Sequence, residues 1–411
     1  MRIIIIGINY WPEVTGIGVF TAYRAEYLAA AGHDVTVCTT FPYYPEWRVH
    51  RKYARRIALS EKRNGVKIVR SYIYIPKHVI PIKRIVHEVS FFISVTLSAL
   101  TQKRPDVLMI VSPPLGLAAT GIILSRLWRI PYIFDVEDLQ PDAAGDLGML
   151  PVWAVKLLYR VEAAAYHFAW LVTTLTPEMK RKIINKGISE NKVKLIEPCM
   201  DDSLVKLSLD EGCKFKQRYN IYNNFIVTYS GNMGVKQGLD VVLNAAALNS
   251  FDDSILFLMV GDGVDRLRLL RNAANLNLHN VRFLPLLNLV DFRGLLAASD
   301  VCLILQQASA SEVAFPSKMV TYLAAGRPIV ASVNPSSVVA RLIRESGAGK
   351  AVQAEDPKAL LNAIYEFKNN NLYILGELAR HYADSHWLQS RVLRNFEQLI
   401  TQFTEPTEHG L

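Results

Sequence analysis

The sequence is poor in cysteine and lacks an apolar helix long enough to span a membrane. Its 411 residues include four cysteines, which show no CxxC or Cys/His spacing of a metal site. The opening run Ile3–Ile6 ends at Gly7 and is too short for a signal peptide. The candidate helix Val89–Leu100 offers only twelve uncharged residues, against about 20 for a membrane span. We therefore expect a cytosolic protein whose cysteines are free thiols, with Cys38 and Cys302 buried in apolar strands.

Recognition patterns for nucleic acids and dinucleotides are also missing. The net charge of +9 would suit a polyanion, but no RNP-like, helix-turn-helix or zinc-finger pattern accompanies it, so nucleic acid is not an expected partner. A dinucleotide fingerprint needs GxGxxG directly after the first strand, whereas eight residues separate Gly7 from Gly16. The sequence therefore argues against an oxidoreductase.

Apolar strand-like runs alternate with helical segments along the whole chain. This order predicts an α/β protein in which parallel sheets are covered by helices, and the length predicts two domains. Mixed polar residues around Glu197–Tyr222 mark the junction, so the domains are expected at residues 1–200 and 221–384, with a last helix near 388–403 that returns to the first. The predicted strands are Arg2–Ile6, Val35–Thr39, Val66–Tyr72, Val107–Val111, Tyr132–Asp135 and Leu171–Thr174, then Phe225–Ser230, Ile255–Val260, Val281–Leu284, Val301–Leu305 and Ile329–Ser332.

Two segments of the second half suit a diphosphate. Ser230–Gly238 follows a strand and carries glycines, exposed N–H groups and Lys236, all of which favour anionic oxygens. Phe315–Lys318 starts a helix whose positive end carries Ser317 and Lys318. Convergence of both segments on one diphosphate is the functional reading, and an ordinary strand-to-helix loop is the alternative. Gly261–Gly263 is better explained as a tight connection.

The first half places glycines and carboxylates at strand ends. Ligands of such two-domain α/β proteins bind in the cleft between the halves. Thr15–Gly18 can bring backbone amides to this cleft from the first half, opposite the diphosphate segments. Glu137–Asp142 follows a strand, where a carboxylate could orient an acceptor hydroxyl or share its proton. Helix capping by Asp138 or Asp142 is the structural alternative.

Two further segments suggest a membrane surface. Between Arg48 and Arg63, seven Lys and Arg residues stand against one Glu. Apolar residues in Ile85–Thr101 recur at helical spacing, with cations before and after them. A solvated basic loop and a core helix are the structural explanations, and contact with an anionic membrane is the functional one.

Taken together, the motifs resemble those of family 4 retaining glycosyltransferases with the GT-B fold. The resemblance spans nearly the whole chain and rests on Gly7–Gly18, Leu28–Val35, Ser230–Gly238 and Pro316–Ser332. The segment Thr40–Pro45 resembles the branch of colanic-acid and O-antigen transferases, including the fucosamine type. The family resemblance implies two Rossmann-like domains that face each other across a cleft.

The resemblance also implies site residues. The second domain would bind a UDP- or GDP-sugar and the first a lipid-linked saccharide acceptor, without a cofactor or metal. Asp138 would lie near the reacting sugar, and Lys318 would stabilise the departing diphosphate. The residues expected to bind substrate are Gly16, Gly18, Gly231, Asn232, Lys236, Glu312, Ser317 and Thr321.

The chain departs from the family pattern at the donor site. Val313 and Thr321 occupy the positions of two glutamates eight residues apart, and Glu312 is displaced by one. Asn232 stands where relatives carry arginine. These changes favour an altered donor, and the acceptor role implies a place on the inner face of the cell membrane. A nucleotide-sugar epimerase and a non-catalytic nucleotide-sugar-binding partner of a polysaccharide assembly complex remain alternatives.

Overall fold

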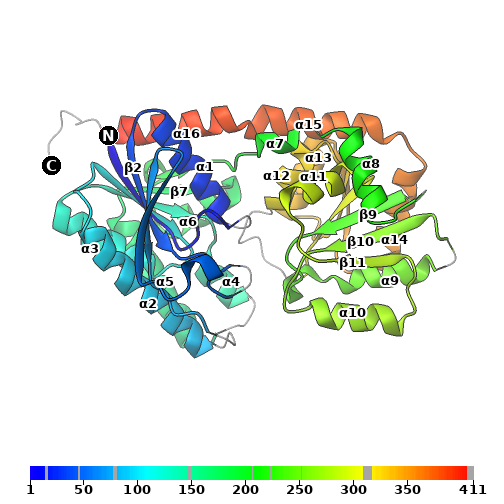
Figure 1. Cartoon of the computed structure of the whole chain (residues 1–411), viewed down its shortest axis with the longest axis horizontal. Coiled ribbons are helices and arrows are strands. Elements are labelled where there is room, and N and C mark those ends of the chain that lie inside the picture. The colour runs from blue at the N-terminus through cyan, green and yellow to red at the C-terminus, as the bar shows by residue number, and fades with distance from the viewer. Residues whose placement is uncertain are drawn as a thin grey trace. The chain divides into compact units, whose positions relative to one another are not determined.

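The computed structural model describes residues 1–13, 17–44, 47–76, 81–146, 150–205, 207–222, 225–250, 252–308 and 317–404. Gly16 and Glu312 lie outside these residues. The chain divides into two compact units, each of which is an α/β unit built on one sheet (Figure 1). The first unit is made of the described residues of 1–198 and 390–404. The second unit is made of the described residues between Cys199 and Gln389.

The first unit contains an eight-stranded sheet in the order β3-β4-β2-β1-β5-β6-β7-β8. Neighbouring strands are parallel except for the antiparallel pair β3 and β4. Most central strands are apolar throughout because helices cover both faces of the sheet. The strands are β1 (Arg2–Ile6), β2 (Asp34–Thr40), β3 (Ala58–Arg63), β4 (Val66–Ser71), β5 (Val107–Ser112), β6 (Tyr132–Val136), β7 (Leu171–Thr174) and β8 (Val193–Leu195).

Two helical layers bury the two faces of this sheet. One face packs on α1 (Ile17–Ala30) and on α16 (Gln389–Thr404), whose Phe396 and Ile400 join the core beside Leu28. The other face packs on α2 (Pro81–Leu100), α3 (Leu117–Trp128) and α5 (Val152–Phe168). The remaining elements of this unit are α4 (Gln140–Asp146), α6 (Pro177–Asn185), η1 (Arg51–Tyr53) and η2 (Glu190–Lys192).

The second unit contains a six-stranded, fully parallel sheet in the order β11-β10-β9-β12-β13-β14. The strands are β9 (Phe225–Ser230), β10 (Ile255–Val260), β11 (Val281–Leu284), β12 (Val301–Leu305), β13 (Ile329–Val333) and β14 (Gly349–Gln353). The helical elements are α7 (Asp202–Val205), α8 (Leu209–Arg218), η3 (Val235–Gln237), α9 (Asp240–Leu248), α10 (Arg266–Asn275), α11 (Leu289–Ala298), α12 (Ser317–Ala324), α13 (Val338–Ser346), α14 (Pro357–Lys368) and α15 (Leu372–Trp387).

Two predicted irregular segments turn out to contain regular structure. The last six of the sixteen residues in the basic segment Arg48–Arg63 form the edge strand β3, so the segment is not simply a loop. The polar stretch Glu197–Tyr222 contains α8, whose Ser208 and Glu211 form a reciprocal capping box. The strands predicted from apolar runs are all present, and Cys38 and Cys302 are buried free thiols as predicted. No helix in the described part of the chain combines the length and apolar composition needed to cross a bilayer.

Candidate functional site

The loop Ser230–Gly238 lies at the carboxyl edge of the second sheet, where α/β proteins bind their ligands. The loops after both neighbouring strands hold it by backbone hydrogen bonds. Gly231 N donates to Val260 O at 2.9 Å, and Met233 N donates to Asp262 O at 2.7 Å. On the other side, Gln307 N donates to Lys236 O at 3.0 Å. The loop is therefore fixed along its length by the sheet beneath it.

Glycines allow this close contact between loops. Gly261 has φ +133°, and a Cβ there would lie 2.0 Å from Gly231 O. Gly263 has φ +157°, and a Cβ there would lie 2.3 Å from Met233 O. No side chain fits at either position, so the Gly261–Gly263 segment is the tight connection that its sequence predicts.

Lys318 reaches this loop from α12. Its Nζ lies 3.9 Å from the centroid of the Tyr229 ring, a cation–π contact. A Cβ on Gly231 would lie 3.0 Å from the same Nζ, so the ammonium is directly beside the loop backbone. The two diphosphate segments predicted from sequence therefore meet in the structure.

Tyr322 ties α12 to the end of β9. Its buried hydroxyl accepts from Ser230 N at 3.2 Å and donates to Ser230 O at 3.4 Å. Because Lys318 and Tyr322 are four residues apart, they lie on the same face of the helix. The anchoring of Tyr322 therefore also fixes where Lys318 projects.

The electrostatics of Lys318 are unusual. Among the described residues, no carboxylate forms an ion pair with it. Desolvation lowers the pKa of its ammonium from the ordinary 10.5 to about 7. An anion placed next to Nζ would oppose this penalty and raise the pKa again. Binding of an anion beside the Lys318 ammonium is therefore electrostatically favourable.

The other predicted donor-site residues surround this contact. Asn232 is exposed, and its carbonyl oxygen accepts from the Tyr229 hydroxyl at 2.6 Å. The side chain of Lys236 is also exposed. At the start of α12, Ser317 is exposed, and its carbonyl oxygen accepts from Thr321 Oγ1 at 3.4 Å.

Asp138 of the first unit lies two residues after the end of β6 and is half-buried. The preceding residues Asp135 and Glu137 are buried and share the guanidinium of Arg24, at 2.5 and 3.0 Å. Thr173 Oγ1 donates to Asp135 at 2.6 Å. The backbone that carries Asp138 is thus fixed by a buried ionic cluster.

One cation faces two carboxylates in this cluster. Burial raises the pKa of Glu137 well above its ordinary value, and the Asp135 charge adds to the shift, while Arg24 opposes it. A proton on Glu137 lets Arg24 pair with a single negative charge. The predicted substrate-binding residue Gly18 has a packing role, because a Cβ on it would lie only 3.0 Å from the backbone nitrogen of Tyr10.

Comparison with known proteins decides the family. Residues 15–199 match the model of the glycosyl transferase 4-like domain, and residues 224–370 match that of glycosyl transferases group 1. A protein of Escherichia coli (strain K12) described as a colanic acid biosynthesis glycosyl transferase, WcaI, is 30% identical over 409 residues. The alignment covers 96% of this chain and 98% of WcaI. The chain belongs to this glycosyltransferase family.

Solved structures agree with the fold of this glycosyltransferase, which is GT-B. The sucrose-phosphate synthase of Thermosynechococcus elongatus superposes with a TM-score of 0.77, at 17% identity and 98% coverage of both chains. Anabaena HepE in complex with UDP-glucose superposes with a TM-score of 0.72, at 17% identity, covering 98% of this chain and 100% of HepE.

Sequence reasoning missed the partners of the predicted residues. Tyr229 is hidden inside a predicted strand and meets Lys318 only in the folded chain. Arg24 left a weak signal: Thr21, Arg24, Ala25 and Leu28 have the spacing of one helical face, and all four are buried. A cation on an otherwise uncharged buried face predicts a carboxylate partner, but it does not say which one.

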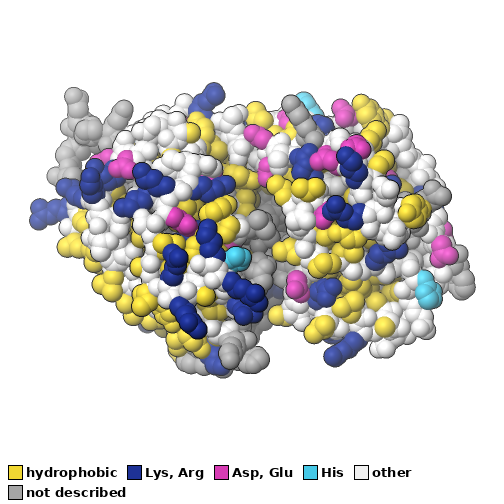
Figure 2. Space-filling view, viewed as in Figure 1, with side chains coloured by type: hydrophobic (Ala, Val, Ile, Leu, Met, Phe, Trp, Pro, Cys, Tyr) yellow, Lys and Arg dark blue, Asp and Glu magenta, His cyan; other side chains and the backbone are white. Residues whose placement is uncertain are grey.

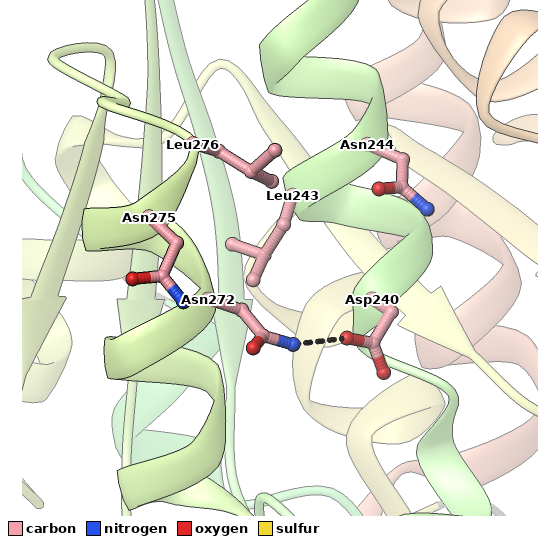
Figure 3. A pocket seen from close by; sticks show the side chains of 6 residues that line it. All are labelled: Asp240, Leu243, Asn244, Asn272, Asn275 and Leu276. Atoms are coloured by element: carbon pink, nitrogen blue, oxygen red, sulfur yellow. Dashed lines mark hydrogen bonds between the residues drawn. The ribbon is translucent and has the colours of Figure 1, made fainter.

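A pocket of about 250 Å³ in the second unit is not part of this site (Figure 3). It lies between α9 and α10 and is lined by Asp240, Leu243, Asn244, Asn272, Asn275 and Leu276. Arg268 already neutralises Asp240 with two hydrogen bonds, at 2.8 and 2.6 Å. With its one carboxylate paired and neutral amides around it, this pocket offers no cation to a diphosphate.

Proposed function

We propose that this glycosyltransferase moves a hexosyl group from a UDP- or GDP-sugar to a lipid-linked saccharide, with retention of the anomeric configuration. The reaction would extend a surface polysaccharide at the inner face of the cell membrane. The enzyme class follows from the family; the donor, acceptor, stereochemistry and location are our proposal.

The observation that carries the proposal is the position of Lys318 beside Gly231 at the carboxyl edge of the sheet. An ammonium without a carboxylate partner among the described residues, held beside a glycine loop that a ligand can approach closely, suits a diphosphate. Lys236 and Asn232, both exposed on the same loop, would add a second cation and an amide. Ser317 and Thr321 would extend the site along the first turn of α12. Anabaena HepE, which has the same fold, binds UDP-glucose.

The chemistry of sugar transfer explains why a cation is needed there. As the bond between the sugar and the diphosphate breaks, negative charge develops on the leaving phosphate oxygens. A lysine held beside those oxygens stabilises this charge more in the transition state than in the ground state. Lys318 would thus act on the leaving group, and the exposed side chains of Asn232 and Lys236 would help to hold it in place.

Asp138 is our candidate for the acceptor side. It is the half-buried carboxylate two residues after β6, and the Arg24 cluster fixes the backbone before it. A carboxylate at this position would orient an acceptor hydroxyl and share its proton. The acceptor class is proposed because the relative WcaI is described as a colanic acid biosynthesis enzyme.

The proposal is tested by incubating the pure protein with a panel of nucleotide sugars and a membrane lipid extract, and by following the release of nucleoside diphosphate. Release that requires both one donor and the lipid would support transfer and name the donor. NMR of the product would then report the anomeric configuration.

The same assay separates the alternatives. A nucleotide-sugar epimerase would change the donor sugar without lipid, and a non-catalytic binding partner would bind the donor without releasing diphosphate. Either result would contradict the proposed function.

A further inference from the structure

Helix α2 is apolar on the side that faces away from the core as well as on the side that faces it. Phe91, Val95 and Ala99 are buried against the sheet. Positions two residues away point to the opposite side, because each residue turns the helix by about 100°. Val89, Ile93 and Leu97 occupy that opposite side, and Leu97 is 61% exposed. An ordinary surface helix would carry charged residues there.

Helices α3 and α5 continue this apolar surface. α3 packs between α2 and α5, and a 2.9 Å hydrogen bond between the Thr96 and Thr120 hydroxyls joins it to α2. Its Leu127 is 62% exposed, and Trp153 of α5 is 71% exposed. Hydrophobic side chains gather along the lower-left edge in Figure 2, where Figure 1 places α2. We call this surface the outer face; its exposed apolar side chains are Ile85, Val86, Val89, Ile93, Leu97, Leu100, Ile123, Leu127, Val152, Trp153 and Leu157.

The charges around the outer face are almost all positive. The cations on these helices and directly after them are Lys83, Arg84, Lys103, Arg104, Arg126, Arg129, Lys156 and Arg160. The helices carry two carboxylates, Glu88 and Glu162, and Asp106 follows α2; each of the three already has a partner. Asp106 accepts from Arg2 N at 2.6 Å. Glu88 pairs with Arg84 at 3.2 Å, and Glu162 is buried and pairs with Lys186 at 2.7 Å.

We propose that the outer face docks on an anionic lipid bilayer. The proposal rests on the membrane location proposed above and adds the surface that makes the contact. Apolar side chains would enter the boundary between headgroups and acyl chains, with lysines and arginines at the level of the phosphates. A tryptophan such as Trp153 suits this boundary because its ring is amphipathic. A two-fold contact with a second copy would bring two basic rims together, which like-charge repulsion disfavours.

The test is flotation with vesicles of phosphatidylglycerol and phosphatidylethanolamine, compared with vesicles of phosphatidylcholine alone. We expect the full-length protein to float with the anionic vesicles at low salt and far less with the neutral ones. The double variant Ile93→Asp/Leu97→Asp should bind roughly 100-fold more weakly, because each aliphatic side chain lost from the membrane removes about tenfold or more in affinity.

A matched control uses exposed apolar residues of the second unit. Leu267→Asp/Val290→Asp changes two such side chains, on α10 and α11, and should float like the wild type. The proposal would be overturned if both double variants lost flotation equally, or if the wild type did not float with anionic vesicles. So would self-association without lipid that only Ile93→Asp/Leu97→Asp abolishes, because that result would assign the face to a second copy.

Catalysis is measured separately, so that failure of the proposed function can be recognised. Diphosphate release with a short-chain, water-soluble acceptor analogue does not depend on the bilayer. We expect Ile93→Asp/Leu97→Asp to retain this activity while it loses flotation. Loss of both flotation and diphosphate release would mean that the substitutions damage the fold. Leu127→Asp/Trp153→Asp would then be tested in the same way, and the proposal would fall if this variant did not lose flotation while keeping diphosphate release.

Discussion

At the scale of single residues, the candidate site depends on charges that are not neutralised in the usual way. Lys318 faces the Tyr229 ring, with no ion pair to a described carboxylate. Glu137 shares one arginine with Asp135, and its pKa rises as a result of burial and of the second charge. Each arrangement costs stability in the free protein, which is common where a fold prepares a group for a ligand or for chemistry.

Substitution of Lys318 tests its role on the leaving group. We expect Lys318→Ala to lower turnover by roughly 10²–10³-fold, the typical effect of removing one donor that stabilises transition-state charge. Lys214→Ala is the control, because Lys214 lies exposed on α8 and pairs with Asp210. Steady-state rates of diphosphate release would measure both variants. Unchanged turnover in Lys318→Ala would remove this lysine from the site.

The raised pKa of Glu137 leads us to expect that the stability of the protein depends on pH. Because its pKa is raised in the folded protein, the folded state keeps a proton that the unfolded state loses above about 4.5. Its contribution to stability is therefore complete at low pH and declines as the pH rises. We expect Glu137→Gln to show a smaller decline than the wild type.

Urea unfolding at a series of pH values from about 5 to 7.5 measures this difference. If the unfolding free energies of the two proteins changed in parallel with pH, the raised pKa of Glu137 would be contradicted. Lys318, whose pKa is lowered to about 7, changes its charge in the upper part of this range in both proteins, so its effect cancels in the difference between the wild type and Glu137→Gln.

At the scale of elements, sequence patterns predict the central strands well and the edge strands poorly. Each central strand is covered on both faces and therefore reads as an apolar run, such as Ile255–Val260. The missed strands β3, β8 and β14 all lie at sheet edges. An edge strand is more exposed, so Ala58–Arg63 and Gly349–Gln353 carry mixed polar residues that resemble a loop.

The glycine turn after β10 tests the element that supports the diphosphate loop. A methyl group at Gly261 would collide with Gly231 O, so we expect Gly261→Ala to displace the loop and weaken nucleoside diphosphate binding. It should also cost about 1–3 kcal/mol of unfolding free energy, because φ is positive there.

Gly187→Ala is the matched control for backbone strain. Gly187 also has a positive φ, at +90°, but nothing lies within 4 Å of its added Cβ. It should lose some stability while binding diphosphate normally, as judged by calorimetry. If Gly261→Ala bound nucleoside diphosphate as tightly as the wild type, the turn would not support the site.

At the scale of the whole molecule, the chain combines a GT-B fold with candidate site residues on both units. Alternating strands and helices predict this fold, and motifs predict the helix start that carries Lys318 and the loops that carry Gly231 and Asp138. The partners of these residues could not be predicted. Tyr229 and Lys318, or Arg24 and Asp135, are far apart in sequence, and only the sheet order brings them together.

The central claim is that Lys318 and the Ser230–Gly238 loop bind the diphosphate of a sugar donor. In the free protein the pKa of Lys318 is about 7, and a bound diphosphate would raise it. Above pH 7, binding must therefore take up a proton, and the affinity should fall as the pH rises.

The decisive measurement is calorimetric titration of UDP and GDP into the wild type and Lys318→Met between about pH 7.5 and 9, where the nucleotide itself no longer titrates. The account predicts that wild-type affinity for the preferred nucleotide falls by up to about tenfold per pH unit, with proton uptake. In Lys318→Met the binding should be weak and independent of pH. Equal affinity of the two proteins across this range would contradict the account.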